Sequence, residues 1–327
     1  MSGLTSISVV VPVFNSQETL LPLIAEVRSA LAGRTFELIL VNDGSRDKSW
    51  KVIEQLSTEH GWIRGIDLMR NYGQHNAVLC GIRAARKEVI ATIDDDLQNP
   101  PSEILKLLPK LEEGFDVVYG TPRRETHGFL RDLASRVTKI TLQGAMGAET
   151  ARNISAFRLF RTKLRDAFDN YSSPFVSIDV LLTWSTQRFA SVPVENRPRT
   201  IGVSNYTIRK LLVHALNMAT GFSIVPLQIA SLLGFCFTIF GFGVLAYVLT
   251  RYFIQGGSVP GFAFLASVIA IFSGAQLFAL GIIGEYIARM HLRTMNRPPY
   301  AVRTVVTEPT TSVVAEKGDW FADSLKP

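Results

Sequence analysis

Two long apolar runs near the end of the chain place the strongest constraint on its fold. Residues 225–249 and 262–284 are almost entirely apolar or small, with Gln228 interrupting the first run and Gln276 the second. A helix of roughly 20 residues crosses a bilayer core of about 30 Å, so each run is long enough to span a membrane. The linker between them contains the turn-forming sequence Gly-Gly-Ser-Val-Pro. We therefore expect a two-helix transmembrane hairpin rather than a buried hairpin of a soluble protein.

Positively charged residues flank this hairpin unevenly. Arg209 and Lys210 precede the first run, whereas the connecting loop is expected to hold only Arg251. Four arginines follow the second run: Arg289, Arg293, Arg297 and Arg303. Lysine and arginine favour the cytoplasmic side of a membrane, so we expect both termini in the cytoplasm. The net charge of +6 suits an anionic membrane surface and a phosphorylated ligand, and we expect no nucleic-acid partner.

The first 120 residues alternate between strand and helix patterns. Short apolar runs predict strands at residues 7–14, 36–42, 65–69, 88–94 and 116–120. Helical patterns lie between them, near residues 17–32, 48–59, 75–86 and 102–113. This alternation predicts an α/β domain with a mostly parallel sheet, covered on both faces, whose strand carboxyl ends build the site. The sequence has no G-x-G-x-x-G after the first strand and no P-loop, which disfavours those nucleotide-binding classes.

Three consecutive aspartates follow the fourth predicted strand. On an extended chain Asp94, Asp96 and Gln98 would point to the same side. Three oxygen ligands of this kind suit Mg²⁺ or Mn²⁺ carrying a phosphate. The alternative is an N-terminal cap for the helix that begins near Ser102. A cap needs one acid and crowding three is electrostatically costly, which favours the metal site.

Two further segments have the pattern of amphipathic helices. In residues 129–145, apolar side chains recur at spacings of three and four with cationic residues between them. Such a helix can lie in a membrane interface, and packing onto the domain's own core is the equally supported alternative. Residues 207–224 lead directly into the first apolar run, which favours the interface. The expected organisation is a cytosolic domain at residues 1–206, a juxtamembrane helix at 207–224, membrane helices at 225–249 and 262–284, and a cytosolic tail at 285–327, with no structure assigned after Tyr300.

Five short motifs in this chain resemble those of a known family. They are PVFN at residues 12–15, VNDGS at 41–45, RNYGQ at 70–74, DDDLQNPP at 94–101 and SAFRLF at 155–160. Followed by two C-terminal membrane runs, they resemble the family 2 glycosyltransferases of the polyprenyl-phosphate class. Within that class the chain resembles bacterial undecaprenyl-phosphate glucosyl- and aminoarabinosyl-transferases and, more distantly, dolichyl-phosphate mannose synthase.

The resemblance implies a GT-A fold and an activity. That activity is inverting transfer of one sugar from a nucleotide diphosphate to undecaprenyl or another polyprenyl phosphate at the cytosolic membrane face. UDP-glucose or a related UDP-sugar is the preferred donor, with GDP left open, and Mg²⁺ or Mn²⁺ is the implied cofactor. The resemblance also implies a protein of the bacterial inner membrane that forms a homo-oligomer; the similar proteins suggest a tetramer, and the sequence does not fix the number of subunits.

The motifs and the chemistry of the reaction nominate individual residues. The nucleotide is expected to contact Pro12, Val13, Asn15, Asp43 and Asp94. The divalent cation is expected on Asp94, Asp96 and Gln98, and the catalytic residues are expected to be Asp94, Asp96 and Arg131. An ionised acceptor phosphate needs cationic groups to fix it rather than a general base. Candidates for that role are Arg123, Arg131, Ser135 and Arg199.

Two other functions stay open from the sequence. One is a glycosyltransferase that extends a lipid-linked saccharide, which would need a carboxylate base beside the acceptor. The other is a catalytically idle nucleotide-sugar-binding scaffold anchored by the hairpin, and the intact Asp94, Asp96 and Gln98 speak against it. The Q-x-x-R-W motif of processive polysaccharide synthases is missing, which disfavours polymerisation.

Overall fold

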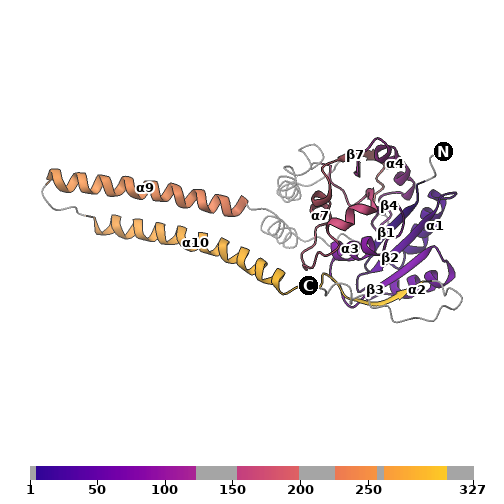
Figure 1. Cartoon of the computed structure of the whole chain (residues 1–327). Coiled ribbons are helices and arrows are strands. Elements are labelled where there is room, and N and C mark those ends of the chain that lie inside the picture. Colours follow the sequence, from indigo (N-terminus) through magenta and orange to yellow (C-terminus); the bar gives the residue numbers. More distant parts are fainter. Residues whose placement is uncertain (1–4, 123–152, 199–224, 256–260, 308–327) are drawn as a thin grey trace, which may run out of the picture.

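The computed structural model describes residues 5–122, 153–198, 225–255 and 261–307. A sheet domain is joined to two long helices that project away from it (Figure 1). The predicted amphipathic segments at residues 129–145 and 207–224 lie outside the described residues, so both stay predictions.

The sheet domain is built on eight strands in the order β7-β5-β6-β4-β1-β2-β3-β8. The strands are β1 (Ile7–Val13), β2 (Phe36–Asn42), β3 (Ile63–Leu68), β4 (Val89–Thr92), β5 (Val117–Pro122), β6 (Arg158–Arg161), β7 (Phe189–Val194) and β8 (Val302–Val306). Among these strands, β6 and β8 run antiparallel to their neighbours and the other pairings are parallel. The predicted mostly parallel sheet is confirmed, whereas β6, β7 and β8 were not predicted.

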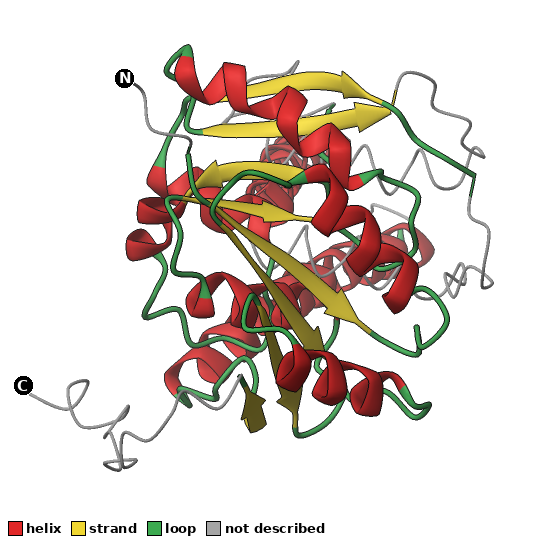
Figure 2. Ribbon diagram, turned by 90° about the vertical axis from the view of Figure 1, so that its right-hand side faces the viewer, coloured by secondary structure: helices red, strands yellow, loops and turns green. Residues whose placement is uncertain are grey.

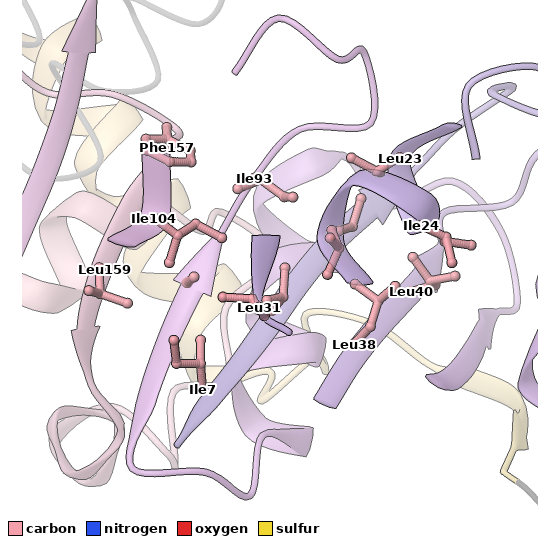
Figure 3. Packing of buried hydrophobic residues seen from close by; sticks show 14 of the residues in the cluster. Ile7, Leu23, Ile24, Leu31, Leu38, Leu40, Ile93, Ile104, Phe157 and Leu159 are labelled. Carbon is pink, nitrogen blue, oxygen red and sulfur yellow. The ribbon is translucent and has the colours of Figure 1, made fainter. Parts of the chain in front are cut away.

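Helices cover both faces of this sheet (Figure 2). They are α1 (Leu20–Ala30), α2 (Ser49–Glu59), α3 (Gln74–Ala84), α4 (Ile104–Glu112) and α7 (Ile178–Ser185), with short 3-10 helices η1 (Pro101–Glu103) and η2 (Thr162–Ala167). Successive strand residues point to opposite faces. Val9 and Val11 therefore join the core under α1, α2 and α4, part of which Figure 3 shows, while Val10 joins the core under α3 and α7. Burial on both faces explains why these strands read as continuous apolar runs.

The predicted membrane hairpin is present as two long helices. They are α9 (Val225–Gln255) and α10 (Phe262–Thr294), which extend beyond the predicted ranges 225–249 and 262–284. Segments long and apolar enough to span a membrane cover Leu227–Ile254 and Ile271–Leu292, with mean hydropathies of 2.2 and 1.5. Arg251 lies inside α9, so the expectation that it belongs to the connecting loop was wrong.

After the hairpin, the chain returns to the sheet. We assigned no structure after Tyr300, yet residues 302–306 form β8, which pairs antiparallel with β3 at the edge of the sheet. Five residues are too few to show a period, although the sequence VRTVV is rich in the β-branched residues that strands favour. If α9 and α10 both span a membrane, the pairing of β8 with β3 requires the C-terminal end of α10 to lie on the same side of the membrane as the sheet domain.

Candidate active site

The loops that follow β1, β2 and β4 meet at one edge of the sheet. Strand β1 lies between β2 and β4, so the strand order reverses beside β1. Open α/β sheets bind ligands at such a reversal, outside the carboxyl ends of the strands. The loops at residues 12–15, 42–45 and 94–98, which the sequence nominated, are all at this edge.

Asp43 holds a neighbouring loop in place. Its carboxylate accepts hydrogen bonds from the backbone N–H groups of Tyr72 (2.7 Å) and Gly73 (2.9 Å), and only 3% of the residue is exposed. Burial raises the pKa of the Asp43 carboxyl, while the two N–H groups act to lower it. Gly44, at a φ of +66°, lets the two loops touch, because a Cβ there would lie 2.5 Å from the nitrogen of Asn71. Each carboxylate oxygen of Asp43 has a second lone pair and can accept a further hydrogen bond from a nucleobase. The contact with the nucleobase stays a prediction.

Asn15 ties the loop after β1 to the loop after β2. Its N–H donates to the Ser45 hydroxyl (3.0 Å), and its side-chain oxygen accepts from the N–H of Arg46 (2.8 Å). Asn15 has a φ of 56°, a conformation that costs energy for residues other than glycine and is common at functional sites. Pro12 and Val13, also nominated for the nucleotide, are buried at the end of β1, and Val13 is part of the core. The side chain of Val13 therefore does not line this edge.

The acidic loop differs from the predicted extended chain. Strand β4 ends at Thr92 rather than at residue 94. Residues 95–96 form a turn and residues 97–99 a bend, in which Leu97 has a φ of 60°. The prediction that an extended chain places Asp94, Asp96 and Gln98 on the same side was therefore wrong, because the chain is not extended here. Asp96 instead accepts a hydrogen bond from the N–H of Gln98 (3.1 Å) across the turn. Asp94 accepts one from the Gln74 side chain at the start of α3 (2.7 Å).

Asp95, to which the sequence assigned no role, joins this loop to the loop after β1. One of its carboxylate oxygens accepts from the Ser16 hydroxyl (2.5 Å) and from the N–H of Phe14 (3.2 Å). Burial raises the pKa of Asp95, and these two hydrogen bonds act to lower it. Asp95 therefore has a bridging role, which leaves Asp94 and Asp96 as the candidates for a ligand. The serine that follows PVFN was the sequence signal for this contact.

The donor set of the acidic loop fits a divalent cation that carries phosphates. Asp94, Asp96 and Gln98 are half-buried and supply two carboxylates and one amide oxygen. Among the described residues, no group of three or more His, Cys, Asp or Glu side chains could hold a metal by itself. Mg²⁺ is usually bound through one or two carboxylates together with substrate phosphates, rather than by a cage made wholly of protein. Asp94, Asp96 and Gln98 are therefore sufficient to bind a divalent cation only together with a phosphate ligand.

A buried ion pair supports the strand that carries this loop. Arg158, within the SAFRLF motif, pairs with Asp179 of α7 and donates to the Thr92 hydroxyl at the end of β4 (3.1 Å). Tyr119 also donates to Asp179 (3.0 Å), and burial raises the pKa of Tyr119 well above its ordinary value. Losing one member of such a network would leave a buried charge unpaired. The motif therefore has a supporting role beneath the site.

The residues nominated for an acceptor phosphate, Arg123, Arg131, Ser135 and Arg199, lie outside the described residues. The described chain nevertheless leads from the site edge into both segments that contain them. Strand β5 runs parallel to β4 and ends at Pro122, at the same edge as the acidic loop. On the other side, the N–H of Arg197 donates to the carbonyl of Gln98 (2.7 Å). The four assignments stay predictions.

Comparison with known proteins identifies the class. The model of the family "Glycosyl transferase family 2" matches residues 8–169, which include β1 to β4 and the acidic loop. An undecaprenyl-phosphate 4-deoxy-4-formamido-L-arabinose transferase from Enterobacter sp. (strain 638) is 33% identical over 321 residues, covering 97% of this chain and 98% of the relative. The Klebsiella pneumoniae protein of the same name is 32% identical and covers 94% of this chain and 95% of the relative. The chain belongs to glycosyl transferase family 2.

Its full-length relatives are named as polyprenyl-phosphate glycosyltransferases, so the resemblance and the GT-A class of fold predicted from the sequence are confirmed. Among solved structures, glucosyl-3-phosphoglycerate synthase from Mycobacterium tuberculosis with UDP is 19% identical, with a TM-score of 0.49 over 66% of this chain and 78% of that one. The same enzyme has been crystallised with Mn²⁺, UDP and glucosyl-3-phosphoglycerate, and that structure has a TM-score of 0.48 at 18% identity over the same shares of both chains.

Proposed function

We propose that this chain transfers a single sugar from a nucleotide-diphosphate sugar to undecaprenyl or another polyprenyl phosphate at the membrane surface. The observation that carries the proposal is that one chain contains both the acidic loop and the apolar hairpin. A donor edge built from Asp43, Asp94 and Asp96 is joined in one chain to two helices whose apolar side chains lie on the surface. The names of the full-length relatives support transfer of a sugar and the same acceptor class.

The donor nucleotide is placed by the loops after β1, β2 and β3. Asn15 and Asp43 face the base end, and uridine is the base we propose. Asp94, Asp96 and Gln98, on the opposite side of the β1 loop, would hold Mg²⁺ or Mn²⁺ beside the diphosphate. When bound, the cation offsets negative charge on the departing diphosphate and so takes the place of a general acid. The rigid core beneath β1 and β4 keeps these two ends of the donor at a fixed separation.

The acceptor phosphate is already ionised at neutral pH, so it attacks without a general base. One of its oxygens forms a bond to the anomeric carbon as the bond from that carbon to the diphosphate oxygen breaks. The configuration inverts, and the nucleoside diphosphate leaves. Arg123, Arg131, Ser135 and Arg199 are proposed to hold the acceptor phosphate, with Arg131 close to the reacting oxygen. Cationic side chains in this role position the nucleophile and compensate its charge.

The sheet domain is proposed to lie in the cytoplasm beside a bacterial inner membrane. Cations cluster where the second span ends, at Arg289 and Arg297, and the positive-inside rule favours the cytoplasm for that end. Pairing of β8 with β3 keeps the sheet domain on the same side. Homo-oligomerisation, for which the resemblance suggests a tetramer, stays a prediction.

The test is transfer by purified protein in membranes that contain undecaprenyl phosphate. The donors are radiolabelled UDP-glucose, UDP-4-deoxy-4-formamido-L-arabinose and matched GDP-sugars, each with Mg²⁺, Mn²⁺ or EDTA. We expect one UDP-sugar to give a chloroform-extractable product that forms only without EDTA. Nucleotide binding without a lipid product from any donor would contradict the proposed function. A product that forms equally in EDTA would contradict the metal assignment alone.

A further inference from the structure

The strand that follows the membrane hairpin enters the sheet next to the donor loops. Strand β8 pairs with β3, but the register shifts near its start: Asp67 is opposite Thr304 and Leu68 is opposite Val302. Arg303 is left over between them, as the extra residue of a β-bulge. Such bulges redirect a side chain and are frequent beside functional sites.

Arg303 makes two contacts at the carboxyl end of β3. Its guanidinium donates to the Asp67 carboxylate (3.0 Å) and to the carbonyl of Met69 (2.8 Å). Asp67 is 2% exposed, so its charge lies inside the domain and needs a partner. The backbone adds a third connection, since the N–H of Met69 donates to the carbonyl of Ala301 (2.9 Å).

The first contact continues across the sheet into the loop after β2. The other oxygen of Asp67 accepts from the Asn42 side chain (2.6 Å), and Asn42 in turn accepts from the N–H of Ser45 (3.3 Å). The Ser45 hydroxyl then accepts from the N–H of Asn15 (3.0 Å). One series of hydrogen bonds therefore crosses four adjacent strands, from the segment after the hairpin to the loop after β1.

The second contact, from Arg303 to the carbonyl of Met69, fixes the loop whose N–H groups bind Asp43. Met69 begins the five-residue connection to α3, and the N–H groups of Tyr72 and Gly73 near its end donate to Asp43. The side chain of Asn71, the residue before Tyr72, donates to the Asp43 carbonyl (3.1 Å). Arg303 thus fixes one end of this connection, and Asp43 is held at the other.

We propose that β8 is part of the donor site and that Arg303 is a positioning residue for nucleotide binding. The segment that follows the membrane hairpin supplies the hydrogen bonds that hold the loop at Asn42 and Asp43 in place. Occupancy of the site and docking of β8 then stabilise each other, because coupling between two binding events is reciprocal. This inference rests on the proposed function, since it requires the donor to bind at these loops.

The first experiment compares Arg303→Gln with wild type, using the full-length protein in detergent with Mn²⁺. We expect the Kd for UDP and the KM for the donor to rise about 10-fold, within the range of 5- to 150-fold typical of coupled sites. We expect kcat to change less than about twofold, because Arg303 does not touch the reacting atoms. Arg303→Lys keeps the charge but not the two-pronged geometry, so its effect should be intermediate.

The chain offers a matched control at the other side of the sheet. Arg188 is also an exposed arginine that pairs with a largely buried aspartate, Asp116, at 3.2 Å. We expect Arg188→Gln to leave the UDP affinity unchanged. An Arg303→Gln protein that binds UDP as wild type does would overturn the inference while leaving the proposed function intact. Failure of wild type to bind either UDP or GDP would overturn the proposed function and the inference with it.

A second measurement needs no variant, and so holds even if Arg303→Gln fails to fold. Amide hydrogen exchange of the wild-type protein should slow at residues 302–306 when UDP is added, along with residues 69–73. Exchange that slows only in the loops, with β8 unaffected, would overturn the proposed coupling.

Discussion

The sheet domain and the hairpin use the same apolar side chains in opposite ways. Leu40 in β2 is fully buried, whereas Leu245 in α9 is 53% exposed; Phe160 is buried and Phe242 is 67% exposed. In water the hydrophobic effect would oppose so many exposed apolar side chains on one pair of helices. The difference is what we expect of one chain folded for two solvents, with water around the sheet domain and, in the proposed function, lipid around the hairpin.

The two regions meet at few described contacts. The Arg289 guanidinium of α10 lies 5.0 Å from the centre of the Phe175 ring, and Ser172 donates to Asn296 just after α10 (3.3 Å). The more extensive connection is β8, which belongs to the sheet although it follows the hairpin in sequence. The comparison therefore predicts that substitutions can impair catalysis without impairing membrane insertion, and the reverse. Substitutions in β8, which connects the two regions, are the exception.

The largest effect is expected from Asp96→Ala. Loss of one of the two carboxylates proposed for the cation should lower transfer at least about 10³-fold, equivalent to about 4 kcal/mol of transition-state stabilisation. Because Asp96 lies far along the chain from the hairpin, the variant should stay in the membrane fraction as wild type does. Initial rates of lipid-product formation and fractionation on the same preparations provide the measurement. Full activity in this variant would refute the metal assignment.

The next effect separates a buried leucine from an exposed one. Leu40→Ala should destabilise the sheet domain by about 2–5 kcal/mol, because it leaves a cavity in a close-packed core. Leu245→Ala removes the same atoms from a side chain on the surface of α9 and should leave the domain's stability unchanged. Urea unfolding followed by tryptophan fluorescence measures both. Equal losses in the two variants would contradict the division between a packed core and a lipid-facing helix.

A charge on each surface sharpens the same comparison. Leu21 on α1 is 59% exposed and Leu245 on α9 is 53% exposed, so the two differ in surroundings rather than in exposure. Leu245→Arg should oppose membrane insertion by about 2.5–3.5 kcal/mol, the cost of arginine near the centre of a spanning helix. Leu21→Arg should change stability by no more than about 0.5 kcal/mol, as is usual for surface substitutions. The two can be compared by alkaline extraction of membranes, and equal extraction would argue that α9 does not face lipid.

The smallest effect concerns pH. Burial raises the pKa of Asp43 from 3.8, so as the pH falls this carboxyl takes up its proton earlier than a free aspartate does. The protonated group holds the N–H groups of Tyr72 and Gly73 less well. UDP affinity should therefore be highest at neutral pH and should fall about 5- to 10-fold as the pH is lowered through the raised pKa of this carboxyl. Asp43→Asn should bind UDP weakly at every pH, and an unchanged acid-side loss in that variant would assign the titration to another group.

The elements that could be predicted from sequence are those whose pattern is local. Strands β1 to β5, helices α1 to α4 and the hairpin each have a continuous apolar run or a helical period of their own. Strand β8 could not be predicted, because its five residues are stabilised by pairing with β3, which precedes it by more than 200 residues. The roles of Asp95 and Asp67 have the same origin. Each is defined by a partner from a distant part of the chain, Ser16 in one case and Arg303 in the other.

The geometry of the acidic loop shows a further limit. The residue types at positions 94, 96 and 98 indicated the chemistry, but the alternation rule assumed that the strand continued to residue 94. The strand ends at Thr92, where its side chain is engaged with Ala156 and Arg158. Composition therefore indicates which ligand atoms the loop can offer, whereas tertiary contacts decide how its side chains are arranged.

The most direct test of the central claim is the mass of the lipid product. Purified protein in vesicles containing undecaprenyl phosphate, supplied with a UDP-sugar and Mn²⁺, should yield a lipid that carries one sugar on a single phosphate. The Asp96→Ala protein in the same vesicles should not. A lipid diphosphate, a longer saccharide, or free sugar with no lipid product from the wild-type protein would contradict the account.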